Sequence, residues 1–84
     1  MLEKGKVIVS LAGRDKGRLL AVMQADKNRV LVCDGKERPI DRPKSKNIRH
    51  VGATAASLSE DDMRGNRALQ KALRRLSAEI NGNT

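Results

Sequence analysis

The absence of aromatic side chains is the feature that most limits how this chain can fold. None of its 84 residues is Phe, Tyr or Trp, so a hydrophobic core has to be built from Val, Leu, Ile, Met and Ala. A chain of this length is close to the lower limit at which one core holds without disulfides or metals. Cys33 is the single cysteine, and no Cys/His cluster has metal-site spacing. We therefore expect one domain with a thin core, no cofactor and no metal.

The chain is also strongly basic. It has 18 Lys and Arg against 10 Asp and Glu, a formal charge of +8. Such a surplus attracts polyanions and releases their counterions on contact, so nucleic acid is the expected partner. The alternative is a charge that only maintains solubility. No membrane partner is expected, because no apolar run approaches the roughly 20 residues of a spanning helix. The N-terminal residues contain no apolar signal region, which favours a cytoplasmic location.

Residues 5–51 alternate short apolar runs with Gly, Asp, Asn and Pro, as is typical of a small antiparallel β domain. Turns are predicted at Asp26–Arg29, where Asn28 tolerates a positive φ, and at Asp34-Gly35. The predicted strands are Lys6–Leu11, Leu19–Ala25, Val30–Cys33, Lys36–Ile40 and Asn47–Val51. Five short strands at this spacing favour a mostly β fold with a small barrel over residues 1–52.

The composition changes after the predicted barrel. Residues 53–58 are small and weakly patterned, which predicts a linker before a C-terminal helix over residues 59–82. Ser59 is expected as the N-cap, with Asp62 at the capping-box position. Gly65-Asn66 weakens the first turns, which would move the firm start of the helix to about Arg67.

Apolar residues recur in the predicted helix at close to helical spacing. The stripe consists of Leu69, Leu73, Leu76 and Ile80. It could dock on the barrel, contact a partner protein or dimerise. Docking is favoured because the barrel core is thin.

The stretch from Val7 to Met23 resembles the KOW motif, a strand followed by a glycine-bearing basic loop and a second strand. Gly17 falls where that family keeps a glycine, which fits a positive φ or a close backbone approach. The resemblance continues through Asn28–Val32 and through the basic tail Arg38–Val51. In this layout the chain is similar to the KOW-type large-subunit ribosomal proteins of archaea and eukaryotes and to their short bacterial relatives. The resemblance implies an SH3-like barrel that binds RNA, commonly ribosomal RNA, through loops and basic strand ends.

The basic residues of the barrel supply candidate phosphate contacts, because Arg offers a planar fork suited to phosphate. The first group lies in the glycine-bearing loop, where the alternative is a solvated turn with Asp15 as its counter-ion. The second runs from Arg38 to Arg49 and is held extended by Pro39 and Pro43, where the alternative is a disordered loop. The third flanks the hairpin tip. The predicted RNA-binding residues are Arg14, Lys16, Gly17, Arg18, Lys27, Arg29, Arg38, Arg42, Lys44, Lys46 and Arg49.

Without aromatic platforms for unpaired bases, these residues favour phosphate and shape contacts on structured RNA. No enzyme is expected, because His50 has no visible carboxylate or nucleophile as a partner, and no catalytic residue is assigned. The sequence therefore predicts a protein of ribosomal type, or one associated with ribosomes, that binds structured RNA and most of all ribosomal RNA. The alternative is a KOW module that docks on RNA polymerase or on another transcription or translation factor.

Overall fold

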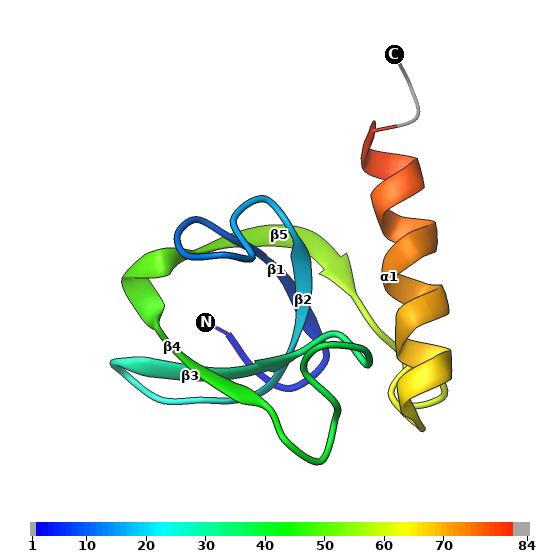
Figure 1. The fold of residues 1–84 in the computed structure, drawn as a ribbon, viewed down its shortest axis with the longest axis horizontal. Helices are drawn as coiled ribbons and strands as arrows, with labels where there is room; N and C mark the ends of the chain where they lie inside the picture. The colour runs from blue at the N-terminus through cyan, green and yellow to red at the C-terminus, as the bar shows by residue number, and fades with distance from the viewer. Residues whose placement is uncertain (1, 82–84) are drawn as a thin grey trace.

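The computed structural model describes residues 2–81, which form one five-stranded antiparallel sheet and a C-terminal helix (Figure 1). The strands are β1 (Lys6–Ser10), β2 (Leu19–Ala25), β3 (Arg29–Cys33), β4 (Lys44–Asn47) and β5 (Val51–Ser57). A 3₁₀ helix, η1 (Ile48–His50), precedes β5, and the α-helix is α1 (Asn66–Asn81). The prediction of a mostly β fold with a C-terminal helix is confirmed.

The strand order explains the barrel shape. The order is β4-β3-β2-β1-β5, so the last strand pairs with the first. The edge strands β4 and β5 are joined directly through η1. Figure 1 shows the sheet curled into a small barrel, with α1 lying along its outside. This arrangement agrees with the expected small five-stranded barrel.

Period-two alternation along the strands separates two apolar clusters. The inner cluster is entirely aliphatic and consists of Ile8, Leu20, Val22, Val30 and Val32. All five residues are buried inside the barrel. Strand neighbours point to opposite faces, so the alternate residues of β1 and β2 lie on the outer face. The core therefore needs no aromatic residue, because a second element covers the outer face.

Helix α1 covers that outer face. Val7 lies opposite Ala21 in the sheet register, and Ala21 lies opposite Cys33. This row is fully buried together with Leu69 of α1, and Leu73 is nearly so. Docking on the barrel is thus confirmed for these two helical leucines. Leu76 is half-buried and Ile80 is 56% exposed, so only the end of the stripe remains open.

The fourth predicted strand, Lys36–Ile40, is wrong. The Asp34 carboxylate accepts hydrogen bonds from the backbone N–H groups of Lys36 and Arg38, at 2.8 and 2.9 Å. These bonds satisfy locally the donors that a strand would have paired with a neighbour. Pro39 follows and has no N–H to donate. The segment is therefore a loop, and β4 begins only at Lys44.

The predicted fifth strand, Asn47–Val51, and the predicted linker, residues 53–58, are also wrong. Asn47 ends β4, and its side chain accepts from the N–H of Arg49 at 2.9 Å, which caps η1. Most of the predicted linker, residues 53–58, belongs to β5. Its small residues have weak strand propensity, but pairing with β1 overrides that propensity. Within β5, Thr54 donates its hydroxyl to the carbonyl of Val7 at 2.7 Å.

The predicted capping box forms, but it does not start the helix. The Ser59 N–H donates to Asp62 Oδ2 at 3.1 Å, and the Asp62 N–H donates to Ser59 Oγ at 3.2 Å. The box closes a single turn, and α1 begins only at Asn66, after Gly65. The expected firm start near Arg67 is thus correct to one residue. Residue 82, the predicted end of the helix, lies outside the described residues.

The hairpin between β2 and β3 forms without the expected positive φ at Asn28. No non-glycine residue between positions 2 and 81 has a positive φ. Asp26 Oδ1 instead accepts from the N–H groups of Asn28 and Arg29, both at 2.8 Å. This Asx-type turn closes the hairpin with ordinary backbone angles.

No helix within residues 2–81 is long and apolar enough to cross a membrane.

Candidate nucleic-acid interface

The loop between β1 and β2, residues 11–18, is a closed turn. The N–H of Gly17 donates to the carbonyl of Ser10 at 2.8 Å, and the N–H of Ser10 donates to the carbonyl of Arg18 at 2.9 Å. Gly17 has φ +88°, and a Cβ built there would meet nothing within 4 Å. The glycine is therefore needed for its backbone angle and not for a close approach. The turn leaves Arg14, Lys16 and Arg18 exposed.

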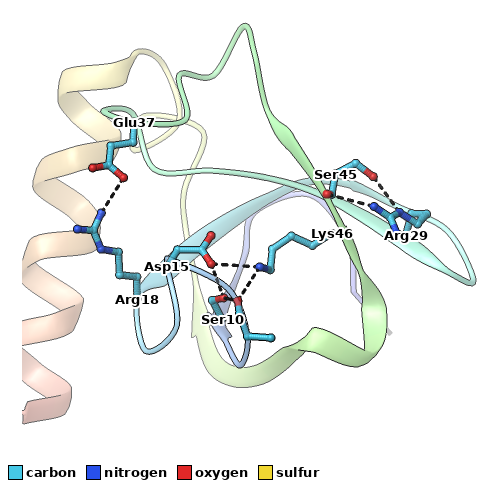
Figure 2. Close-up of polar contacts among 8 residues, drawn as sticks. Ser10, Asp15, Arg18, Arg29, Glu37, Ser45 and Lys46 are labelled. Carbon is cyan, nitrogen blue, oxygen red and sulfur yellow. Dashed lines mark hydrogen bonds and ion pairs between the residues drawn. The ribbon is translucent and has the colours of Figure 1, made fainter.

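The Asp15 side chain points toward Ser10 and Lys46 (Figure 2). Its Oδ1 accepts from Ser10 Oγ at 2.7 Å and from Lys46 Nζ at 3.1 Å. Lys46 Nζ also donates to the Ala12 carbonyl at 3.1 Å. The Asp15 side chain is only 12% exposed, and that of Lys46 is only 6% exposed. Asp15 is thus the counter-ion of Lys46 and not of the loop cations.

This pairing corrects the prediction for Lys46. The side chain is directed inward by the alternation of β4 and is held by a carboxylate and a carbonyl. It joins the loop to β4 and is not available to a phosphate. Burial favours a raised pKa for Asp15, but the hydrogen bonds from Ser10 and Lys46, with the charges of Lys46 and Lys44, outweigh it and lower the pKa.

The second basic loop, residues 34–43, is fixed to helix α1. Asn66 Oδ1 accepts from the N–H of Ile40 at 2.8 Å, and Gln70 Nε2 donates to the carbonyl of Gly35 at 2.7 Å. A Cβ on Gly35 would lie 2.3 Å from the carbonyl oxygen of Asn66, so only glycine allows this approach. The structure therefore favours an ordered loop over the alternative of a disordered one. The helix holds Gly35 and Ile40, and backbone hydrogen bonds join Arg38 to Asp34 and Gly35.

The two basic loops meet at one pocket of ≈ 340 Å³. Its lining residues are Arg14, Asp15, Arg18, Leu20, Asp34, Glu37, Arg38 and Lys44. We call this pocket the interface pocket. Its four cations come from the β1–β2 loop, from the 34–43 loop and from the start of β4. Among residues 2–81, Arg14, Arg38 and Lys44 form no salt bridge. The pocket therefore presents unpaired positive charge to a ligand.

Within residues 2–81, the three acids of the interface pocket form one salt bridge with its four cations, that between Glu37 and Arg18. Asp15 is paired with Lys46, and Asp34 uses Oδ1 on backbone N–H groups. Glu37 pairs with Arg18 at 3.2 Å (Figure 2), but the two side chains are 63% and 54% exposed. Exposed pairs of this kind contribute about 0–1 kcal/mol. An incoming phosphate can therefore replace Glu37 on Arg18 at little cost.

The remaining predicted contacts do not line the interface pocket. Arg29 is held by Ser45, donating to its hydroxyl at 3.0 Å and to its carbonyl at 3.2 Å. Lys27 lies beside a separate, mainly apolar pocket at the mouth of the barrel. Lys16, Arg42 and Arg49 are exposed. The structure thus brings together Arg14, Arg18, Arg38 and Lys44 out of the predicted set.

Two acids of this site, Asp34 and Glu37, were not predicted from the sequence. Asp34 carried a usable signal, because Asp before Gly at a strand end often bonds to the following backbone. Glu37 carried none, since its partner Arg18 is distant in sequence.

Other reactive groups lie apart from the interface pocket. Cys33 is fully buried, and burial together with the Asp34 charge raises the pKa of its thiol to about 11. In the part of the chain that the structure describes, no three His, Cys, Asp or Glu side chains are grouped so that they could hold a metal ion. His50 is exposed in η1.

A comparison of the chain with models of protein families found no match. A search of the curated proteins likewise found no significant match.

Proposed function

We propose that this protein binds structured RNA, and ribosomal RNA in particular, as a ribosomal-type or ribosome-associated protein of the cytoplasm. The observation that carries the proposal is the interface pocket, in which Arg14, Arg18, Arg38 and Lys44 converge from three segments. Three of these four cations, Arg14, Arg38 and Lys44, form no salt bridge within residues 2–81. Clustered unpaired cations cost free energy until an anion neutralises them.

The chemistry of the pocket fits a phosphate backbone. Three of its cations are arginines, whose planar guanidinium can donate two parallel hydrogen bonds to a phosphate. The chain has no aromatic side chain on which an unpaired base could stack. Recognition by phosphate position and groove shape, as on a folded RNA, is therefore favoured over reading of single-stranded bases. The resemblance to the KOW family supports RNA over other polyanions.

The alternative is a barrel that docks on RNA polymerase or another factor with the helical stripe as a second contact, and it has less support. Leu69 and Leu73 are buried against the barrel, so they cannot also contact a partner protein. That alternative predicts that the protein co-purifies with polymerase subunits and that this association survives nuclease treatment.

The proposal is tested by titrating a folded ribosomal RNA fragment into the protein over a series of salt concentrations. We expect tighter binding than that of a basic control such as lysozyme, with affinity falling steeply as salt rises. Sedimentation of a cell lysate through a gradient should place the protein with ribosomal particles. Binding no tighter than that of the basic control would rule the proposal out.

A further inference from the structure

A second groove lies between the β1–β2 loop and helix α1, with a volume of ≈ 410 Å³. Its lining residues are Gly17, Arg18, Leu19, Asp34, Lys36, Gln70, Leu73, Arg74 and Ser77. We call it the helix groove. Three of these residues are cations, and two of them, Lys36 and Arg74, were not among the residues predicted to bind RNA.

The helix groove continues the interface pocket. Arg18 and Asp34 line both, so the two hollows share a wall. Figure 2 shows Arg18 reaching from its loop towards Glu37, alongside α1. A ligand that occupies the interface pocket and extends past Arg18 therefore enters the helix groove.

The groove is built from fixed parts. Its floor includes Leu73, which is nearly buried, and the partly buried Leu19. One wall is joined to the other by the hydrogen bond from Gln70 Nε2 to the carbonyl of Gly35. The backbone segments that carry Lys36 and Arg74 are thus held together before any ligand arrives, which lowers the entropy cost of binding.

The charges in the groove are available. Neither Lys36 nor Arg74 forms a salt bridge with any described residue. Asp34 is the only carboxylate among the groove's lining residues, and it accepts backbone hydrogen bonds. The groove therefore suits an anion that approaches from the interface pocket.

We propose that the helix groove is a second phosphate subsite, in which Lys36 and Arg74 contact the sugar-phosphate backbone of the RNA that occupies the interface pocket. Helix α1 then has two roles, since one face completes the core and the adjoining flank contacts RNA. This inference rests on the proposed function and extends it to a helix outside the KOW-like segment.

Two neighbouring arginines provide the test. Arg74 lines the helix groove, whereas Arg75 lies on another flank of α1 and pairs with Asp62 at 3.7 Å. We expect Arg74→Gln to lower the affinity for a ribosomal RNA fragment about five-fold. The salt slope, which is the slope of the logarithm of the binding constant against the logarithm of salt concentration, should become shallower by about one. Arg75→Gln removes the same charge and should leave both nearly unchanged. Lys36→Gln should behave like Arg74→Gln, with Lys71→Gln on the solvent side of α1 as its control.

Circular dichroism and thermal unfolding establish that each variant is folded before binding is compared. Equal effects of Arg74→Gln and Arg75→Gln on the affinity for RNA would overturn the proposed subsite. In that case Arg14→Gln and Arg38→Gln still report on the interface pocket. A wild-type protein that binds no better than the basic control would instead overturn the proposed function.

Discussion

The residue whose environment differs most from its sequence context is Lys46. It lies in a run of cations, yet its ammonium is buried between Asp15 and the Ala12 carbonyl. Removing one partner of a buried ion pair is costly, because the other charge is left without compensation. The pair therefore fixes the β1–β2 loop in the conformation that exposes Arg14 and Arg18.

We expect Asp15→Asn to lower the free energy of unfolding by about 3 kcal/mol, because Lys46 remains buried without its carboxylate. Urea unfolding measures this change. Asp61→Asn is the control, since its pair with Arg64 is exposed and should contribute little. Equal losses in the free energy of unfolding for the two variants would show that the buried pair stabilises the fold no more than the exposed pair does.

The same pair predicts a dependence on pH. The folded state lowers the pKa of Asp15 from its ordinary value of 3.8. A carboxyl with a lowered pKa contributes stability above its unfolded pKa, and this contribution is lost as the pH falls through the folded pKa. The stability gap between the wild type and Asp15→Asn should therefore narrow below about pH 4. A gap that stays constant on acidification would contradict this assignment.

Glu37 acts at the same scale as a competitor of phosphate. It pairs with Arg18 on the rim of the interface pocket. Glu37→Gln frees Arg18 and removes a repulsive charge, so we expect a several-fold higher affinity for ribosomal RNA at low salt. Glu60→Gln changes the net charge equally at an exposed position away from this pocket. If both variants bind alike, the effect is one of net charge alone.

At the scale of elements, the attachment of α1 to the barrel depends on Gly35. Gly35 and Gly17 have similar positive φ values of 82° and 88°, but only Gly35 faces another backbone, that of Asn66. Gly35→Ala should therefore loosen the helix, whereas Gly17→Ala should show backbone strain alone, of order 1 kcal/mol.

Cys33 reports on this loosening because it is buried beneath α1. Its raised pKa keeps the native thiol neutral and slow to react. Alkylation of Cys33 under native conditions should be faster in Gly35→Ala than in Gly17→Ala or the wild type. Equal rates in the two glycine variants would contradict the close approach between the loop and the helix.

Strands defined by their own sequence pattern were predicted from the sequence, whereas elements defined by contacts with distant residues were not. The bounds of β2 were predicted correctly, and β1 and β3 to within one residue, because alternating aliphatic runs define them. In contrast, β5 contains Gly and several Ala residues and owes its strand form to pairing with β1. Local rules failed at Lys36–Ile40, where a single carboxylate replaced the hydrogen bonds of a strand.

At the scale of the whole molecule, the fold collects charge that is dispersed in sequence. Arg14 and Arg18 are some twenty residues from Arg38 and further from Lys44, and the strand order brings them to one pocket. The sequence could identify both groups as basic, but not that they would meet. It also could not show that Lys46 faces inward, because the bounds of β4 were not recognised. The docked helix adds Lys36 and Arg74 beside the same pocket.

The central claim is that this convergence, and not the net charge of the chain, binds RNA. It is tested most directly by comparing two triple variants over a salt series with the same ribosomal RNA fragment. Arg14→Gln/Arg38→Gln/Lys44→Gln removes the unpaired cations of the interface pocket, and Arg64→Gln/Lys71→Gln/Arg75→Gln removes three exposed cations elsewhere. Both variants lower the formal charge from +8 by three, to +5.

We predict that the pocket variant loses at least about ten-fold more affinity than the control variant, with a salt slope shallower by about three. The control variant should keep a slope close to that of the wild type. Equal weakening of the two variants at every salt concentration would contradict the account.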